Sequence, residues 1–80
     1  MHRTKVESSN VESIGYDRHA KILEIEYKSG GIYQYPETKA AEYADLMAAE
    51  SKGRYIKNHF VTEARPYTRM EEENADKDAD

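Results

Sequence analysis

Residues 20–35 read AKILEIEYKSGGIYQY, and this stretch decides the fold that the sequence predicts. Leu23, Ile25 and Tyr27 alternate with charged residues, which is the period-two pattern of a strand with one covered face. Ser29-Gly30-Gly31 supplies the residue types that a tight turn needs, and residues 32–35 follow as the next strand. We therefore expect an antiparallel hairpin here.

The flanking segments extend this hairpin into an α+β fold. Residues 11–17 mix β-branched and aromatic side chains and predict a preceding strand. After Pro36, apolar residues recur at helical spacing among alanines, which predicts a main helix ending near Gly53 and a short second helix over residues 55–60. Because an amphipathic helix buries its apolar stripe on a sheet, we expect a three-stranded antiparallel meander packed by these two helices.

The charge distribution separates a body from a tail. The chain has 80 residues, enough for one domain, which we place at residues 1–70. Residues 71–80 carry six acidic side chains and one lysine, with no apolar side chain larger than alanine, and predict a disordered acidic tail. The body is nearly neutral, but residues 51–69 hold five basic side chains against Glu63 alone.

Several classes of chemistry are disfavoured by the residues present. The chain has no cysteine, which excludes disulfides, thiolate-bound zinc and a cysteine nucleophile. Its three histidines follow no metal-ligand spacing, and Ser29-Gly30-Gly31 lacks the lysine of a phosphate-binding loop. We therefore expect no enzyme, metal or cofactor. Charges in residues 1–10 and the lack of a long apolar run predict a cytoplasmic protein without membrane association.

Two features are candidates for binding. Tyr33 and Tyr35 project from the same strand face about 7 Å apart, a spacing that suits two splayed bases. The alternative is that both rings belong to the core, with hydroxyls that reach water. The second feature is the basic segment 51–60, whose cations can pair with phosphates or simply solvate the surface. The predicted nucleic-acid-binding residues are Tyr33, Tyr35, Lys52, Arg54, Tyr55, Lys57 and Arg65.

Six short motifs occur in order along the chain: Ser8-Ser9-Asn10, Ile14-Gly15-Tyr16-Asp17, Leu23-x-Ile25-x-Tyr27, residues 29–35, residues 50–55 and Pro66-Tyr67. Together they resemble the KTSC domain family over most of residues 6–69, with Tyr33-x-Tyr35 and Ser51-Lys52-Gly53 as the most specific elements. That family is a short domain at the C-terminus of some lysyl-tRNA synthetases, and it also forms stand-alone small proteins of bacteria and phages. Its attachment to a tRNA enzyme suggests RNA binding, and the resemblance carries that suggestion to this chain.

The sequence departs from the family pattern at two places. Lys39 stands where a proline is common, and residues 61–65 replace a more basic run, which weakens the phosphate-binding interpretation there. The leading hypothesis is a non-enzymatic RNA-binding or tRNA-associated module that uses exposed tyrosines and the basic segment. The alternative is a protein-protein interaction module of bacterial or phage origin. The oligomeric state stays open.

Overall fold

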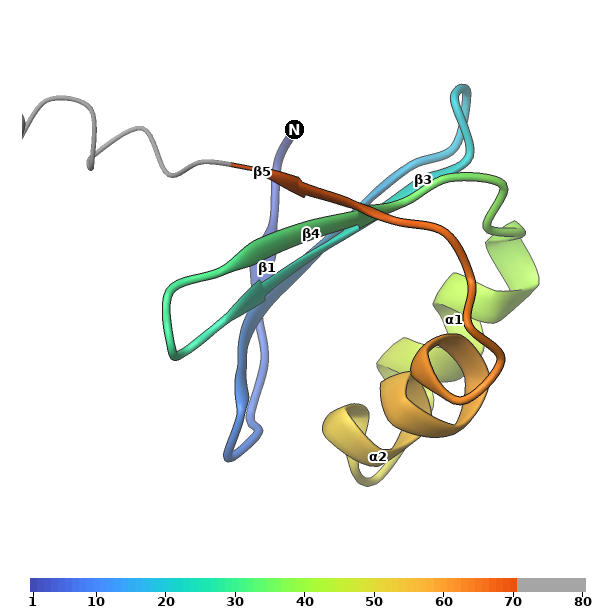
Figure 1. Ribbon diagram of the computed structural model, residues 1–80. Coiled ribbons are helices and arrows are strands. Elements are labelled where there is room, and N and C mark those ends of the chain that lie inside the picture. Colours follow the sequence, from blue (N-terminus) through green and yellow to red (C-terminus); the bar gives the residue numbers. More distant parts are fainter. Residues whose placement is uncertain (71–80) are drawn as a thin grey trace, which may run out of the picture.

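The computed structural model describes residues 1–70, so the predicted disordered tail over residues 71–80 lies outside the described residues. These residues form five strands and three helical segments: four strands come first, the helical segments follow, and a last strand ends the described chain (Figure 1). Their bounds are β1 (Thr4–Lys5), β2 (Val11–Asp17), β3 (Ile22–Tyr27), β4 (Ile32–Tyr35), α1 (Ala40–Ala48), α2 (Lys52–Ile56), the π-helix η1 (Lys57–Val61) and β5 (Thr68–Met70). The α+β class is confirmed.

The sheet is antiparallel throughout, in the order β1-β2-β3-β4-β5. Its centre is the expected meander, with β2 and β4 at the predicted bounds. The prediction of three strands is nevertheless wrong, because β1 and β5 pair along the two edges. These edge strands have two and three residues, which is too short for an alternating pattern to identify them.

The main helix is shorter than the sequence predicts. Lys39 is the N-cap of α1, and its backbone N–H donates to the Glu42 carboxylate at 2.8 Å. The helix ends at Ala48, and α2 starts at Lys52. Ser51 is the N-cap of α2, because its hydroxyl accepts a hydrogen bond from the Arg54 backbone N–H at 3.2 Å. The prediction that Gly53 ends the main helix is wrong, since Gly53 lies inside α2.

All helices lie on one face of the sheet, and the core fills the space between the two layers (Figure 1). The phenol of Tyr35 packs on the ring of Phe60 with 4.8 Å between centroids, which joins β4 to η1. Within residues 1–70, eight hydrophobic side chains are buried, namely Val11, Ile14, Leu23, Ile25, Tyr35, Leu46, Ile56 and Phe60. Complete burial of an aliphatic member contributes about 1.5–3 kcal/mol.

The helix-free face of the sheet carries a polar network. Arg3, next to β1, pairs with the Glu24 carboxylate and donates from Nε to the Ser13 hydroxyl at 3.0 Å. Gln34 donates to Glu24 at 2.6 Å, and the Ser13 hydroxyl donates to Glu26 at 2.7 Å. Because Glu24 is 5% exposed, the arginine and the amide compensate a carboxylate that the edge strand helps to bury.

Candidate binding site

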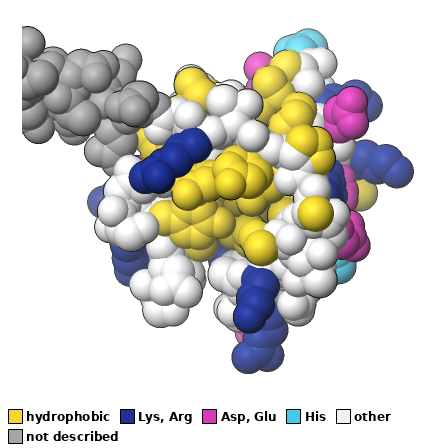
Figure 2. All heavy atoms as spheres, viewed as in Figure 1, with side chains coloured by type: hydrophobic (Ala, Val, Ile, Leu, Met, Phe, Trp, Pro, Cys, Tyr) yellow, Lys and Arg dark blue, Asp and Glu magenta, His cyan; other side chains and the backbone are white. Residues whose placement is uncertain are grey.

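A hollow opens between the sheet and η1 on the face where hydrophobic side chains gather (Figure 2). We call it the tyrosine hollow. It has a volume of about 330 Å³ and is lined by Tyr27, Ser29, Gly31, Tyr33, Tyr35, Val61, Tyr67 and Arg69. This volume lies at the lower end of the range of small-ligand pockets. Three strands and the end of a helix therefore build one concave aromatic surface.

The tyrosines of the hollow pack on one another, one pair edge to face and the others tilted, and the ring of Tyr67 stays largely exposed. Tyr33 contacts Tyr27 in a T-shaped arrangement at 5.4 Å between centroids, and Tyr67 leans on Tyr33 at 5.1 Å. Tyr67 also reaches Tyr35 at 5.7 Å. The side chain of Tyr67 is still 55% exposed, and that of Val61 is 56% exposed. The rim of the hollow is thus apolar, aromatic and accessible.

Arg69 gives the hollow its charge. Its guanidinium carbon lies 5.6 Å from the centroid of the Tyr33 ring, a cation–π arrangement. Gly31 makes room for this pair, since a Cβ there would lie 2.9 Å from Tyr33 Cε1 and 3.4 Å from an Arg69 nitrogen. Among residues 1–70, Arg69 is the only charged residue that lines the hollow. Its surface therefore favours a planar ligand that carries negative charge.

The phenols beneath the rim stay protonated at neutral pH. Burial raises the pKa of Tyr27 to about 12, with smaller contributions from neighbouring Tyr35 and Tyr33. Burial also raises the pKa of Tyr35, and the neighbouring Tyr67 adds to the effect. Because a phenolate in the hollow would be poorly solvated, these groups act as neutral hydrogen-bonding hydroxyls and do not oppose an anion.

The helical wall of the hollow has the rare π geometry. The Thr62 backbone N–H donates to the Lys57 carbonyl at 2.8 Å, an i to i+5 bond, and η1 follows α2 directly. Lys57 begins this helix and is exposed, but it is not among the residues that line the hollow.

The Tyr33-x-Tyr35 motif divides between the hollow and the core. Tyr33 is half-buried and forms the middle of the hollow. Tyr35 is 3% exposed, so the prediction that both rings are accessible is wrong for Tyr35. The reason is that β4 turns this face toward the helices, and Phe60 of η1 covers the second ring. The Tyr33 ring is therefore open to stacking, whereas Tyr35 contributes only the small part of its surface that lines the hollow.

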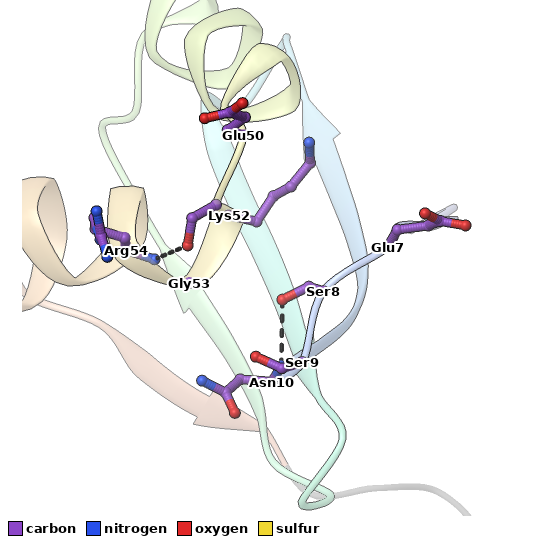
Figure 3. Close-up of a pocket in the computed structure, with 9 residues that line it drawn as sticks. Glu7, Ser8, Ser9, Asn10, Glu50, Lys52, Gly53 and Arg54 are labelled. Carbon is purple, nitrogen blue, oxygen red and sulfur yellow. Dashed lines mark hydrogen bonds between the residues drawn. The ribbon is translucent and has the colours of Figure 1, made fainter.

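Lys52 and Arg54 lie in a second cavity, which we call the serine pocket. It has a volume of about 240 Å³ and is lined by Glu7, Ser8, Ser9, Asn10, Glu50, Ser51, Lys52, Gly53 and Arg54 (Figure 3). Lys52 Nζ donates to the Ala49 carbonyl at 2.8 Å. The pocket joins two of the motifs that the resemblance singles out, Ser8-Ser9-Asn10 and Ser51-Lys52-Gly53, although about 40 residues separate them in the sequence.

Arg65 and Tyr55 lie on another side, next to α1. Arg65 donates to both carboxylate oxygens of Glu42, at 2.5 and 3.3 Å, and its guanidinium lies 4.4 Å from the centroid of Phe60. The ring of Tyr55 stacks on His59 at 4.1 Å. Burial raises the pKa of Tyr55, and the nearby carboxylates of Asp45 and Glu42 raise it further. These two predicted ligands face carboxylates, and we leave them out of the candidate site.

The tyrosine hollow contains residues that the sequence prediction did not include. Tyr67 and Arg69 come after Pro66, in a stretch without periodicity, and reach Tyr33 only because β5 pairs with β4. The Pro66-Tyr67 motif was the one available signal. Among residues 1–70, no helix is long and apolar enough to cross a membrane, and no three metal-binding side chains cluster.

Comparison with known proteins places these features in a family context. The family model described as "KTSC domain" matches residues 7–62. An uncharacterized protein of Stutzerimonas stutzeri is 34% identical over 71 residues, which cover 89% of this chain and all of the relative. A protein of Tsukamurella paurometabola is 43% identical over 51 residues, covering 64% of this chain and 76% of the relative. The crystal structure of a KTSC domain protein from Yersinia pestis superposes with a TM-score of 0.78 at 32% identity, covering 86% and 96% of the two chains.

Proposed function

The chain belongs to the KTSC domain family, for which RNA binding has been suggested, and we propose that it is a non-enzymatic module that binds single-stranded RNA. One base enters the tyrosine hollow and stacks on Tyr67 and Tyr33, while Arg69 pairs with an adjoining phosphate. The observation that carries the proposal is the Arg69 guanidinium over the Tyr33 ring, at the rim of a hollow without a carboxylate among its described lining residues.

Stacking and charge supply the binding free energy in this proposal. Stacking of a base on an aromatic side chain is worth about 1–3 kcal/mol and tolerates any base, because every base has a π-face. Phosphate contacts release counterions, so affinity falls as salt rises. On a single strand, the logarithm of the binding constant falls by about 0.7 per contact for each tenfold rise in salt. With Arg69 as the cation of the hollow, we expect weak, salt-sensitive binding with little sequence preference.

A fluorescence-anisotropy titration with labelled oligouridylate tests the proposal. Tyr67→Ala and Arg69→Gln should each weaken binding about five- to tenfold, the loss of roughly 1–1.4 kcal/mol. Arg18→Gln is the matched control, because Arg18 is an exposed cation in the β2–β3 turn and does not line the hollow. If the wild-type chain shows no binding at 50 mM salt, the proposal is abandoned.

A protein ligand is the second candidate. The exposed Tyr67 and Val61 form an aromatic and apolar rim, and β5 leaves one edge of the sheet without a further strand among residues 1–70. Salt dependence distinguishes the two kinds of complex. An RNA complex weakens steeply between 50 and 200 mM salt, whereas a complex built on β5 backbone and apolar contacts does not.

A further inference from the structure

The tyrosine hollow and the serine pocket are connected. A third hollow of about 540 Å³ lies between them, lined by Ser9, Asn10, Tyr27, Lys28 and Ser29. It shares Tyr27 and Ser29 with the tyrosine hollow, and it shares Ser9 and Asn10 with the serine pocket. The three cavities therefore adjoin as one groove, which we call the long groove.

The walls of the long groove are held in place by backbone hydrogen bonds. The Lys28 backbone N–H donates to the Asn10 carbonyl at 2.8 Å, which fixes the two turns beside each other. The Ser8 hydroxyl accepts from the backbone N–H groups of Asn10 and Val11, both at 3.2 Å. These bonds hold the backbone of the turn at residues 8–11, and they do not use the side chains of Ser9 and Asn10. A ligand can therefore bind these side chains without a change in the conformation of the turn.

Two of the free polar side chains of the serine pocket, Ser9 and Asn10, are neutral, and they lie beside the charged side chains of Glu7, Glu50 and Arg54. Within residues 1–70, the Ser9 hydroxyl and the Asn10 carboxamide make no hydrogen bond, and both residues are exposed. Figure 3 shows them opposite Gly53, whereas Glu7 and Glu50 lie at the outer ends of the pocket. A hydroxyl and an amide can both donate and accept, which matches a sugar hydroxyl better than a bare phosphate.

Cations follow the same path. Arg69 lines one end of the long groove, Lys28 its middle, and Lys52 and Arg54 its other end. An extended strand laid along the groove meets a cation at each stage. The neutral donors and acceptors of Ser9 and Asn10 beside such cations suit a ribose flanked by phosphates, and the 2′-hydroxyl is the group by which a protein distinguishes RNA from DNA.

We propose that the serine pocket is a second subsite that takes a ribose of the strand whose base occupies the tyrosine hollow, so that Ser9 and Asn10 select RNA over DNA through the 2′-hydroxyl. This inference rests on the proposed function and adds the extent of the ligand and its sugar. It predicts that mononucleotides bind poorly, and that affinity rises once an oligonucleotide is long enough to span the long groove.

The test compares oligouridylate with oligodeoxyuridylate of the same length, which differ only in the 2′-hydroxyl. The full chain is titrated with each labelled probe by fluorescence anisotropy. The wild-type chain should bind the RNA at least threefold more tightly. Ser9→Ala combined with Asn10→Ala should remove this preference while the affinity for the DNA stays unchanged. Asn58→Ala is the matched control, an exposed asparagine on η1 that lines none of the three cavities.

Each outcome decides between the two proposals. Equal binding of both probes, weakened by Tyr67→Ala, keeps the proposed function and overturns the ribose subsite. A preference for RNA that survives the Ser9 and Asn10 substitutions also overturns it, because the selection then occurs elsewhere. Binding of neither probe overturns the proposed function itself. Circular dichroism of every variant verifies the fold before binding is interpreted.

Discussion

The Arg65 guanidinium donates two hydrogen bonds to the carboxylate of Glu42, which lies 23 residues earlier in the sequence, with nitrogen–oxygen distances of 2.5 and 3.3 Å. The same guanidinium covers the Phe60 ring and donates to the Glu37 carbonyl at 3.2 Å. One arginine thereby ties the segment after η1 to the first turn of α1 and to the chain before it. This segment leads to β5, so the pair also helps to position Tyr67 and Arg69.

Glu42→Gln should destabilise the fold by about 0.5–1 kcal/mol at pH 7, since it removes the charge of the ion pair. The glutamine can still accept from the Lys39 N–H, so the helix cap is retained. The hydrogen bond from Arg65 lowers the pKa of Glu42, so its stabilisation is present above the unfolded-state pKa and is lost as pH falls through the lower folded-state value.

The difference in unfolding free energy between wild type and Glu42→Gln should therefore shrink at acidic pH. Urea denaturation followed by circular dichroism, repeated from pH 7 to pH 3, measures it. Glu7→Gln changes an exposed glutamate without a recorded ion pair among residues 1–70 and should behave as wild type. A Glu42→Gln deficit that stays constant over this range contradicts the prediction.

Tyr35→Ala should lower the free energy of unfolding by about 3 kcal/mol, because it removes a buried ring that packs on Phe60. For a domain of this size, that loss lowers Tm by more than about 12 °C. Tyr35→Phe keeps the ring and should cost little, as the hydroxyl bonds to no other residue within 1–70. Tyr67→Ala should change Tm only slightly, since Tyr67 is mostly exposed. Thermal melts of the three variants decide whether Tyr35 belongs to the core.

Gly53→Ala should stabilise the chain by about 0.5–1 kcal/mol. Gly53 lies in α2, and a Cβ there meets only the Asn10 amide nitrogen at 3.6 Å, an ordinary contact. Alanine has the higher helix propensity and restricts the unfolded chain. If Gly53 instead ended the main helix in a left-handed conformation, the same substitution would destabilise. The sign of the change in the urea midpoint distinguishes the two.

Gly31→Ala should weaken RNA binding severalfold with a smaller effect on stability. The added methyl group would lie 2.9 Å from the Tyr33 ring, which must shift within the tyrosine hollow, and 3.4 Å from the Arg69 guanidinium that packs on this ring. Anisotropy titrations of this variant beside the wild type measure the change. Unaltered affinity, with the fold intact, means that the ligand does not use the hollow.

Arg3→Met should cost about 1–3 kcal/mol, because the buried Glu24 carboxylate loses its cation. Adding Glu24→Gln should recover part of the loss, since a neutral amide no longer needs the arginine. The four proteins of this double-mutant cycle are compared by urea denaturation, and a coupling free energy of about 0.5 kcal/mol or more is expected. Additive effects of the two substitutions would show that Arg3 acts only through packing.

Much of the fold follows from local patterns. The alternation of Leu23, Ile25 and Tyr27 and the turn at residues 29–31 specify the central hairpin, because side-chain period and turn chemistry act over a few residues. The family motifs were also readable, since they are short and contiguous. The edge strands β1 and β5 were not, as two or three residues acquire strand geometry only by pairing with a neighbour.

The fate of individual candidate side chains depended on contacts between distant segments. Nothing local separates Tyr35, which Phe60 buries, from Tyr67, which stays at the surface. Arg65 looks like any other cation until α1 brings Glu42 to it. The chain sequence by itself determined the hairpin, the helical content and the stock of tyrosines and cations. Tertiary structure alone decided which of these tyrosines and cations share a hollow, because the burial and ion pairing of a side chain depend on which distant segments pack against it.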